Sequence, residues 1–111
     1  VLAPERSDFY NGLGLTYYRM NRLNDALKFF HTATRVNPND AVAKYNEACA
    51  LARLGNNQMA LKALEDAISL DPSLTDLARK DSDFASLHDS NQFNKIVNKM
   101  VGAKPETAPA H

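Results

Sequence analysis

The side chains able to do metal or nucleophilic chemistry are few in this 111-residue chain, and they are scattered along it. They are one cysteine, Cys49, and three histidines, His31, His88 and His111. No two of them stand at the spacing of a zinc motif, and a thiolate–imidazole pair would need Cys49 and His88 to meet in space. We interpret Cys49 instead as a small residue in a helix stripe or in a groove wall. We therefore expect no metal and no cofactor.

Carboxylates and glycines offer two further patterns that could do chemistry. Asp81, Asp83 and Asp89 suggest a calcium loop, but the stretch lacks the central glycine and the closing glutamate of such a loop. Aspartates at these places fit helix starts, where a carboxylate interacts well with the helix dipole. Gly12 and Gly14 form a G-x-G pair without the third glycine of a phosphate-binding loop. We predict no catalytic constellation and expect that the chain is not an enzyme.

Charge and hydropathy exclude two classes of partner. The 13 basic and 13 acidic residues balance, so the chain lacks the positive excess that nucleic acid or an anionic membrane surface attracts. No apolar run approaches the roughly 18 residues of a membrane-spanning helix, and no signal peptide is visible. We expect neither nucleic-acid binding nor membrane insertion. The chain begins at Val1 rather than Met, so we expect an upstream region and take the cytoplasm as the default compartment.

The elements that must position these residues come from an internal repeat. Residues 7–38 align with residues 41–72 at a spacing of 34 residues, which is the mark of a helical repeat array. The matched pairs are Gly14 with Ala48, Tyr17 with Leu51, Ala26 with Ala60, Phe30 with Leu64, Ala33 with Ala67 and Pro38 with Pro72.

The first copy resembles the tetratricopeptide repeat, whose pattern sets a large aromatic, Leu-Gly, Tyr, Ala, Phe, Ala and Pro at fixed offsets. The matching residues here are Tyr10, Leu13, Gly14, Tyr17, Ala26, Phe30, Ala33 and Pro38. The second copy is looser, with Lys44 and Glu47 in place of the aromatic and the leucine. The resemblance implies an all-α fold, an α-solenoid of antiparallel helix pairs with two repeats and a helical C-terminal cap.

We divide the chain into five segments on this register. An atypical last segment is expected because a repeat array leaves an apolar face at its end that must be covered. The segments are residues 1–6, a leader or the end of a preceding repeat; 7–40, the first repeat; 41–74, the second repeat; 75–101, a helical capping segment; and 102–111, a disordered tail.

Local signals predict where the repeat helices begin and end. Helices are expected over residues 7–20, 24–36, 41–54 and 58–70. Ser7 is expected to cap the first of them, and Asn39 and Asp40 the third. Asn21 and Gly55 occupy the turn position that needs a positive φ.

Two helices are expected in the capping segment. We expect Asp81 or Ser82 to cap a short helix that carries Phe84 and Leu87. Asp89, followed by Gln92 at the spacing of a capping box, opens the last helix.

The resemblance also implies a binding face, because in this family the first helix of each pair lines the concave side of the solenoid. Apolar and aromatic anchors, amides that pair with a peptide backbone and arginines that hold carboxylates suit a peptide ligand. The predicted partner-binding groove consists of Asn11, Leu15, Tyr18, Arg19, Val42, Tyr45, Asn46, Cys49 and Arg53.

One subtype of the family binds carboxyl-terminal peptides of heat-shock chaperones through a clamp of Lys and Asn. Only Asn46 matches that clamp here, since Asn11 and Leu15 stand where its first Lys and first Asn belong. We predict that this chain lacks the clamp activity.

The sequence thus predicts a non-catalytic protein–protein interaction module that binds a peptide or protein segment in the concave groove, within a larger scaffold or assembly protein. Three alternatives stay open. The module could self-associate as a homo-oligomer, its groove could be filled by the chain's own terminal helix, or it could be the regulatory domain of an enzyme outside this chain.

Overall fold

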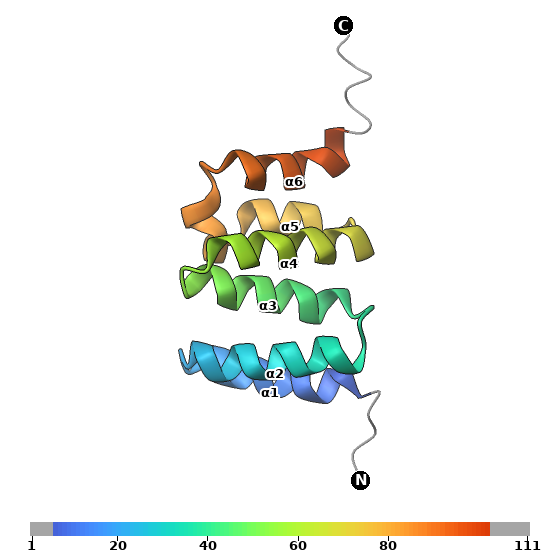
Figure 1. The fold of residues 1–111 in the computed structure, drawn as a ribbon, viewed down its shortest axis with the longest axis vertical. Coiled ribbons are helices and arrows are strands. Elements are labelled where there is room, and N and C mark those ends of the chain that lie inside the picture. Colours follow the sequence, from blue (N-terminus) through green and yellow to red (C-terminus); the bar gives the residue numbers. More distant parts are fainter. Residues whose placement is uncertain (1–5, 103–111) are drawn as a thin grey trace, which may run out of the picture.

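The computed structural model describes residues 6–102. The elements are α1 (Ser7–Arg19), α2 (Leu23–Val36), α3 (Ala41–Arg53), α4 (Asn57–Leu70), α5 (Leu74–Lys80), the 3₁₀ helix η1 (Ser82–Leu87) and α6 (Asn91–Gly102). They stack one above another from α1 to α6 (Figure 1). The predicted all-α solenoid of antiparallel helix pairs is confirmed. Our expectations for residues 1–5 and 103–111 lie outside the described residues.

Within the first pair, the close approach of α1 and α2 depends on a missing side chain. Gly14 is buried, and a Cβ there would lie 2.5 Å from two ring carbons of Phe30 and 3.2 Å from the carbonyl oxygen of Ala26. Phe30 and Ala26 are themselves fully buried. Only a glycine lets the ring sit this close to the α1 backbone. Gly12, two residues earlier, faces open space.

The turns inside the two pairs follow the predicted chemistry. Asn21 has a φ of 61° and Gly55 a φ of 85°, so both lie in the left-handed region, as predicted. Asn and Gly tolerate this region better than other residues, and each one ends a helix by turning the chain sharply.

The helix starts confirm one predicted cap and correct two. Asp40 caps α3, since its Oδ1 accepts from the amide of Ala43 at 3.0 Å. Ser7 does not cap α1; it is the first helical residue, and its Oγ donates to Asp40 Oδ2 at 2.7 Å. The hydroxyl is thus engaged with the start of the neighbouring pair. Asn39 lies in the preceding turn and provides no cap.

The capping segment contains one helix more than predicted. α5 has only seven residues, too few to show a helical period, and the sequence did not indicate it. η1 begins as predicted, with Asp81 Oδ1 accepting from the amide of Asp83 at 2.9 Å. The prediction that Asp89 opens α6 is wrong. Ser90 does so instead, its Oγ accepting from the amide of Phe93 at 3.2 Å.

The main core lies between the second helix pair and the segment that follows it. Phe84 of η1 and Phe93 of α6 are buried together, with ring centroids 6.0 Å apart, and the rings of Phe84 and of Tyr45 of α3 form a T-shaped pair with centroids 5.6 Å apart. α5, η1 and α6 therefore cover the apolar side of α3 and α4. None of the described helices combines the length and apolarity that crossing a membrane requires.

Candidate functional site

We use the name A-helix face for one set of side chains on α1 and α3: Asn11, Leu15, Tyr18, Arg19, Val42, Tyr45, Asn46, Cys49 and Arg53. These are the residues of the predicted groove. Asn46 Nδ2 donates to Asn11 Oδ1 at 2.9 Å, joining the two helices near their middle. The guanidinium of Arg53 lies 5.1 Å from the ring centre of Tyr18 and joins them again near their ends.

The structure brings most of this set together but leaves two members apart. A cleft of about 80 Å³ between α1, α3 and η1 is lined by Leu15, Tyr18, Phe30, Tyr45, Asn46, Cys49, Asp81 and Asp83. Arg19 and Val42 do not line it. Both are exposed side chains of the same two helices, Val42 with half of its surface accessible.

The start of η1 lies on this face, which sequence reasoning missed. Tyr45 Oη donates to Asp81 Oδ2 at 2.7 Å, and Tyr18 Oη donates to Asp83 Oδ2. Arg53 Nε lies 3.9 Å from Asp83 Oδ1, so the carboxylate that this arginine was expected to hold comes from the chain itself. A segment of the chain itself thus occupies part of the A-helix face. It is the loop of Asp81–Asp83 and not the terminal helix.

Two of the predicted groove residues are consequently buried. Tyr45 has 5% and Cys49 has 4% of its surface exposed, beneath Asp81 and Asp83. Burial and the hydrogen bond to Asp81 raise the pKa of Tyr45, and burial with the hydrogen bond to Asp83 raises the pKa of Tyr18. Both phenols therefore stay protonated and donate to the carboxylates. They hold the loop in place.

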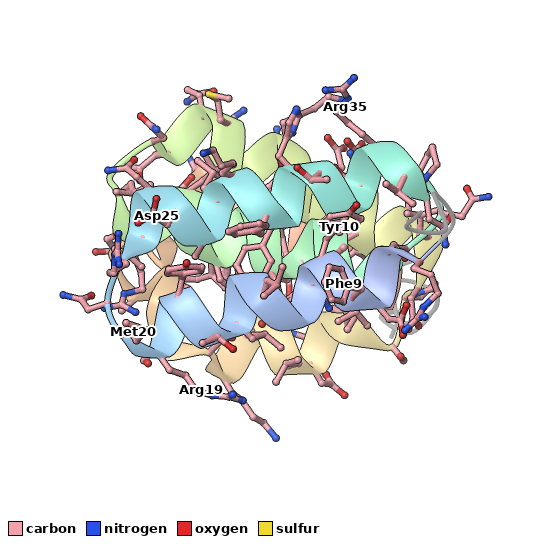
Figure 2. The ribbon with its side chains drawn as sticks, turned by 90° about the horizontal axis from the view of Figure 1, so that it is seen from below. Phe9, Tyr10, Arg19, Met20, Asp25 and Arg35 are labelled. Carbon is pink, nitrogen blue, oxygen red and sulfur yellow. The ribbon has the colours of Figure 1, made fainter. Side chains whose placement is uncertain are left out.

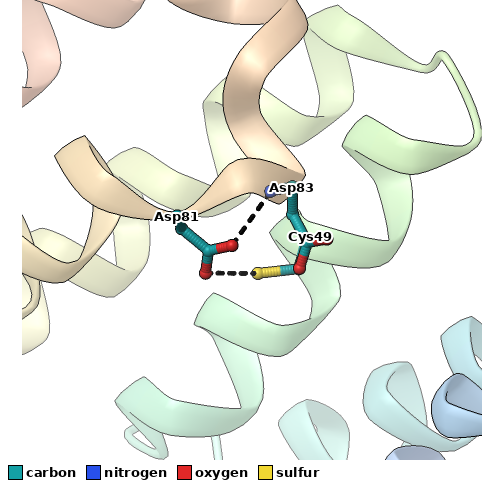
Figure 3. A group of neighbouring side chains, drawn as sticks. All are labelled: Cys49, Asp81 and Asp83. Atoms are coloured by element: carbon teal, nitrogen blue, oxygen red, sulfur yellow. Dashed lines mark hydrogen bonds between the residues drawn. The ribbon is translucent and has the colours of Figure 1, made fainter.

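Cys49, Asp81 and Asp83 form a group whose potential ligand atoms lie within 4.8 Å of one another (Figure 3). Burial, then the charges of Asp81 and Asp83, raise the pKa of the Cys49 thiol, which donates weakly to Asp81 at 3.8 Å. A thiol binds metal or attacks a substrate only after losing its proton. The two carboxylates are moreover engaged with Tyr18, Tyr45 and Arg53. The donor set does not suit a metal ion.

The histidines in the described part of the chain lie away from this group. His88 packs its ring against Phe93, with centroids 5.2 Å apart. His31 is exposed on α2, and its Nδ1 lies 3.1 Å from Glu47 Oε2. Neither histidine has a ring contact or a hydrogen bond with Cys49 in the described part of the chain. These contacts therefore give no support to a thiolate–imidazole pair.

Comparison with known proteins agrees with this geometry. Models of the tetratricopeptide repeat match residues 7–40 and residues 41–74. Hsp70-Hsp90 organizing protein 3 of Arabidopsis thaliana is 34% identical over 75 residues, which are 68% of this chain and 13% of that protein. The Hsp70-Hsp90 organizing protein of Triticum aestivum is 32% identical over 72 residues, 65% of this chain and 12% of that protein. The chain spans about an eighth of the length of these relatives.

Proposed function

Because this chain belongs to the tetratricopeptide repeat family, we propose that it is a non-catalytic protein–protein interaction module whose partner binds on the A-helix face. The protein-binding role follows from the repeats. The place of binding rests on the side chains of α1 and α3, and we argue it from them.

The observation that carries the proposal is the amide pair Asn11–Asn46. Asn46 Nδ2 donates to Asn11 Oδ1, which leaves the Nδ2 of Asn11 and the Oδ1 of Asn46 without a hydrogen bond to any other described residue. One free donor and one free acceptor side by side match the carbonyl and the amide of a peptide unit. The pair is thus suited to hold the backbone of an extended segment independently of its sequence.

The surroundings of the amide pair favour a ligand with apolar side chains. Leu15 is partly exposed and Val42 is 50% exposed, so both can receive such side chains. Arg53 already pairs with Asp83, and the carboxylates of Asp81 and Asp83 disfavour a strongly acidic ligand at the cleft. We propose an uncharged, apolar segment of a partner protein rather than an acidic carboxyl-terminal tail.

The names of the relatives suggest which partners to examine first. They are organizing proteins of Hsp70 and Hsp90, and on that likeness we propose that this module serves an assembly of other proteins. Hsp70 and Hsp90 are the first candidates, bound through a segment other than a clamped carboxyl terminus.

Affinity capture with matched variants tests the site. Val42→Glu places a charge on the A-helix face, and Leu77→Glu does the same on α5; each original residue is 50% exposed, so neither change disturbs the core. We expect the amount of captured partner protein to fall at least tenfold with Val42→Glu and to stay at the wild-type level with Leu77→Glu. Equal capture by both variants would exclude the A-helix face as the binding site.

A second candidate function, self-association, is favoured by the outer side of the first helix pair. Phe9 is 42% and Met20 is 56% exposed there, and Figure 2 views this end of the stack with both residues labelled. One period later, the equivalent of Phe9 is Ala43, which is completely buried. A second copy seated on this end would bury Phe9 in the same way.

Sedimentation velocity distinguishes this candidate. A dimer that dissociates in Phe9→Glu would support self-association through the α1–α2 end. A dimer whose dissociation constant is near 1 mM has a binding free energy of about 4 kcal/mol. A wild type that is still monomeric near that concentration would eliminate self-association.

A further inference from the structure

A long trough lies on the side of α3 away from the A-helix face. α3 lies between α2 and α4 in the stack (Figure 1). Side chains of α2, α3 and α4 surround a first cavity of about 370 Å³, and side chains of α3 and α4 line two more, of about 290 and 310 Å³, the last of them together with Pro38. The first two cavities share Glu47, Leu51 and Met59, and the last two share Lys44 and Asp66. The three therefore join end to end. We call them the B-helix trough.

The floor and one wall of the trough are apolar. Leu51 and Ala63 are buried at its base, and Leu27 contributes from α2. On the α4 side, Met59 is 62% and Leu70 is 40% exposed, although both are apolar. Single exposed apolar residues are common, whereas exposed apolar side chains that border a groove with an apolar floor favour an interaction surface.

The rim of the trough has an excess of positive charge. Lys28, Lys44 and Lys62 line it together with His31, against the carboxylates of Glu47 and Asp66. Asp66 lies 3.4 Å from Lys62 and 4.0 Å from Lys44.

The second carboxylate on the rim is also engaged, because Glu47 lies 3.1 Å from His31. Lys28 forms no ion pair with another described residue. Positive potential along this edge therefore favours a ligand with negative charges.

We propose that the B-helix trough binds an acidic amphipathic helix of a partner protein. The trough runs beside α4, whose 14 residues span about 20 Å, so a helix of roughly the same length fits along it. The apolar stripe of such a helix lies on Leu27, Leu51 and Met59, and its carboxylates face Lys28 and Lys62. An amphipathic helix in an apolar groove is a recurrent mode of recognition. This surface is separate from the A-helix face and does not depend on it.

The test uses two synthetic helical peptides of 14 residues and the full chain labelled with ¹⁵N. One peptide has leucines on one helical face and glutamates elsewhere, and the other has lysines in place of the glutamates. We expect the glutamate peptide to shift amide resonances of α2 and α4, and to bind at least tenfold more tightly than the lysine peptide. No binding at millimolar peptide, equal binding of both peptides, or shifts confined to other helices would overturn the proposal.

Matched variants fix the location. Met59→Glu introduces a carboxylate into the trough, while Met20→Glu makes the same change at a methionine of similar exposure, 56% against 62%, that does not line the trough. Binding of the glutamate peptide should fall at least tenfold in Met59→Glu and stay unchanged in Met20→Glu and in Val42→Glu. A loss in Val42→Glu with none in Met59→Glu would move the peptide to the A-helix face and refute the assignment.

Discussion

At the scale of single residues, the hydroxyl groups of Tyr18 and Tyr45 decide what the A-helix face presents to a partner. Each donates to one aspartate of the Asp81–Asp83 loop, so the loop lies on the face and covers Cys49. The arrangement needs protonated phenols and a protonated thiol, because an ionised group there would face two carboxylates. The free energy of unfolding should therefore depend on pH in alkaline solution.

The Cys49 thiol allows the sign of that dependence to be worked out. Its folded pKa lies above that of the unfolded chain, so above about pH 8.5 the unfolded chain releases a proton that the folded chain keeps, and unfolding becomes easier. Between pH 8.5 and 9.5 this group should cost about 1 kcal/mol of stability. Urea unfolding of Cys49→Ala should show a shallower fall over this interval than the wild type, whatever its stability at pH 7. Parallel curves would contradict the assignment.

The two glycines of α1 make a matched pair. Gly14→Ala puts a methyl group 2.5 Å from the Phe30 ring and should destabilise the chain by about 1–3 kcal/mol through overpacking. Gly12→Ala meets no atom within 4 Å and should stabilise the chain by about 1 kcal/mol through helix propensity. Chemical denaturation of both variants checks the opposite signs. Two stabilising changes would show that helix propensity outweighs packing at Gly14, and a destabilised Gly12→Ala would contradict the open space at Gly12.

At the scale of helices, Asp40 links the two repeats. One of its carboxylate oxygens caps α3, and the other accepts from Ser7 at the start of α1. Asp40→Ala should cost about 1–2 kcal/mol, since it removes a cap and leaves a buried hydroxyl without its acceptor. Asn56 precedes α4 without a side-chain cap, so Asn56→Ala is the control and should change stability by less than about 0.5 kcal/mol. Thermal unfolding that ranks the two equally would contradict the role of Asp40.

The same scale shows which features a sequence can specify. The positive φ of Asn21 and of Gly55 was predicted correctly because each depends only on its own turn. Ser7 was assigned wrongly because its partner is 33 residues away, and α5 was missed because seven residues carry no period.

The candidate site divides in the same way. Its positions on α1 and α3 were implied by the resemblance to the repeat family. The contact of Tyr45 with Asp81, across 36 residues, joins a repeat to a segment that does not repeat, and no pattern in the sequence encodes it.

At the scale of the whole molecule, the helix stack presents two unlike surfaces on either side of α3. The A-helix face has a pair of amides, partly exposed apolar side chains and carboxylates of its own. The B-helix trough is apolar at its base and cationic at its rim. We propose a partner for each surface, and a module that binds two partners suits a place within a larger assembly.

Site-specific photo-crosslinking tests the central claim, that a partner protein lies on the A-helix face. A photoreactive residue in place of Val42 and another in place of Leu77, two positions that are each 50% exposed, report on this face and on α5. The account predicts covalent partner adducts from position 42 and none from position 77. Adducts from position 77 with none from position 42 would contradict it.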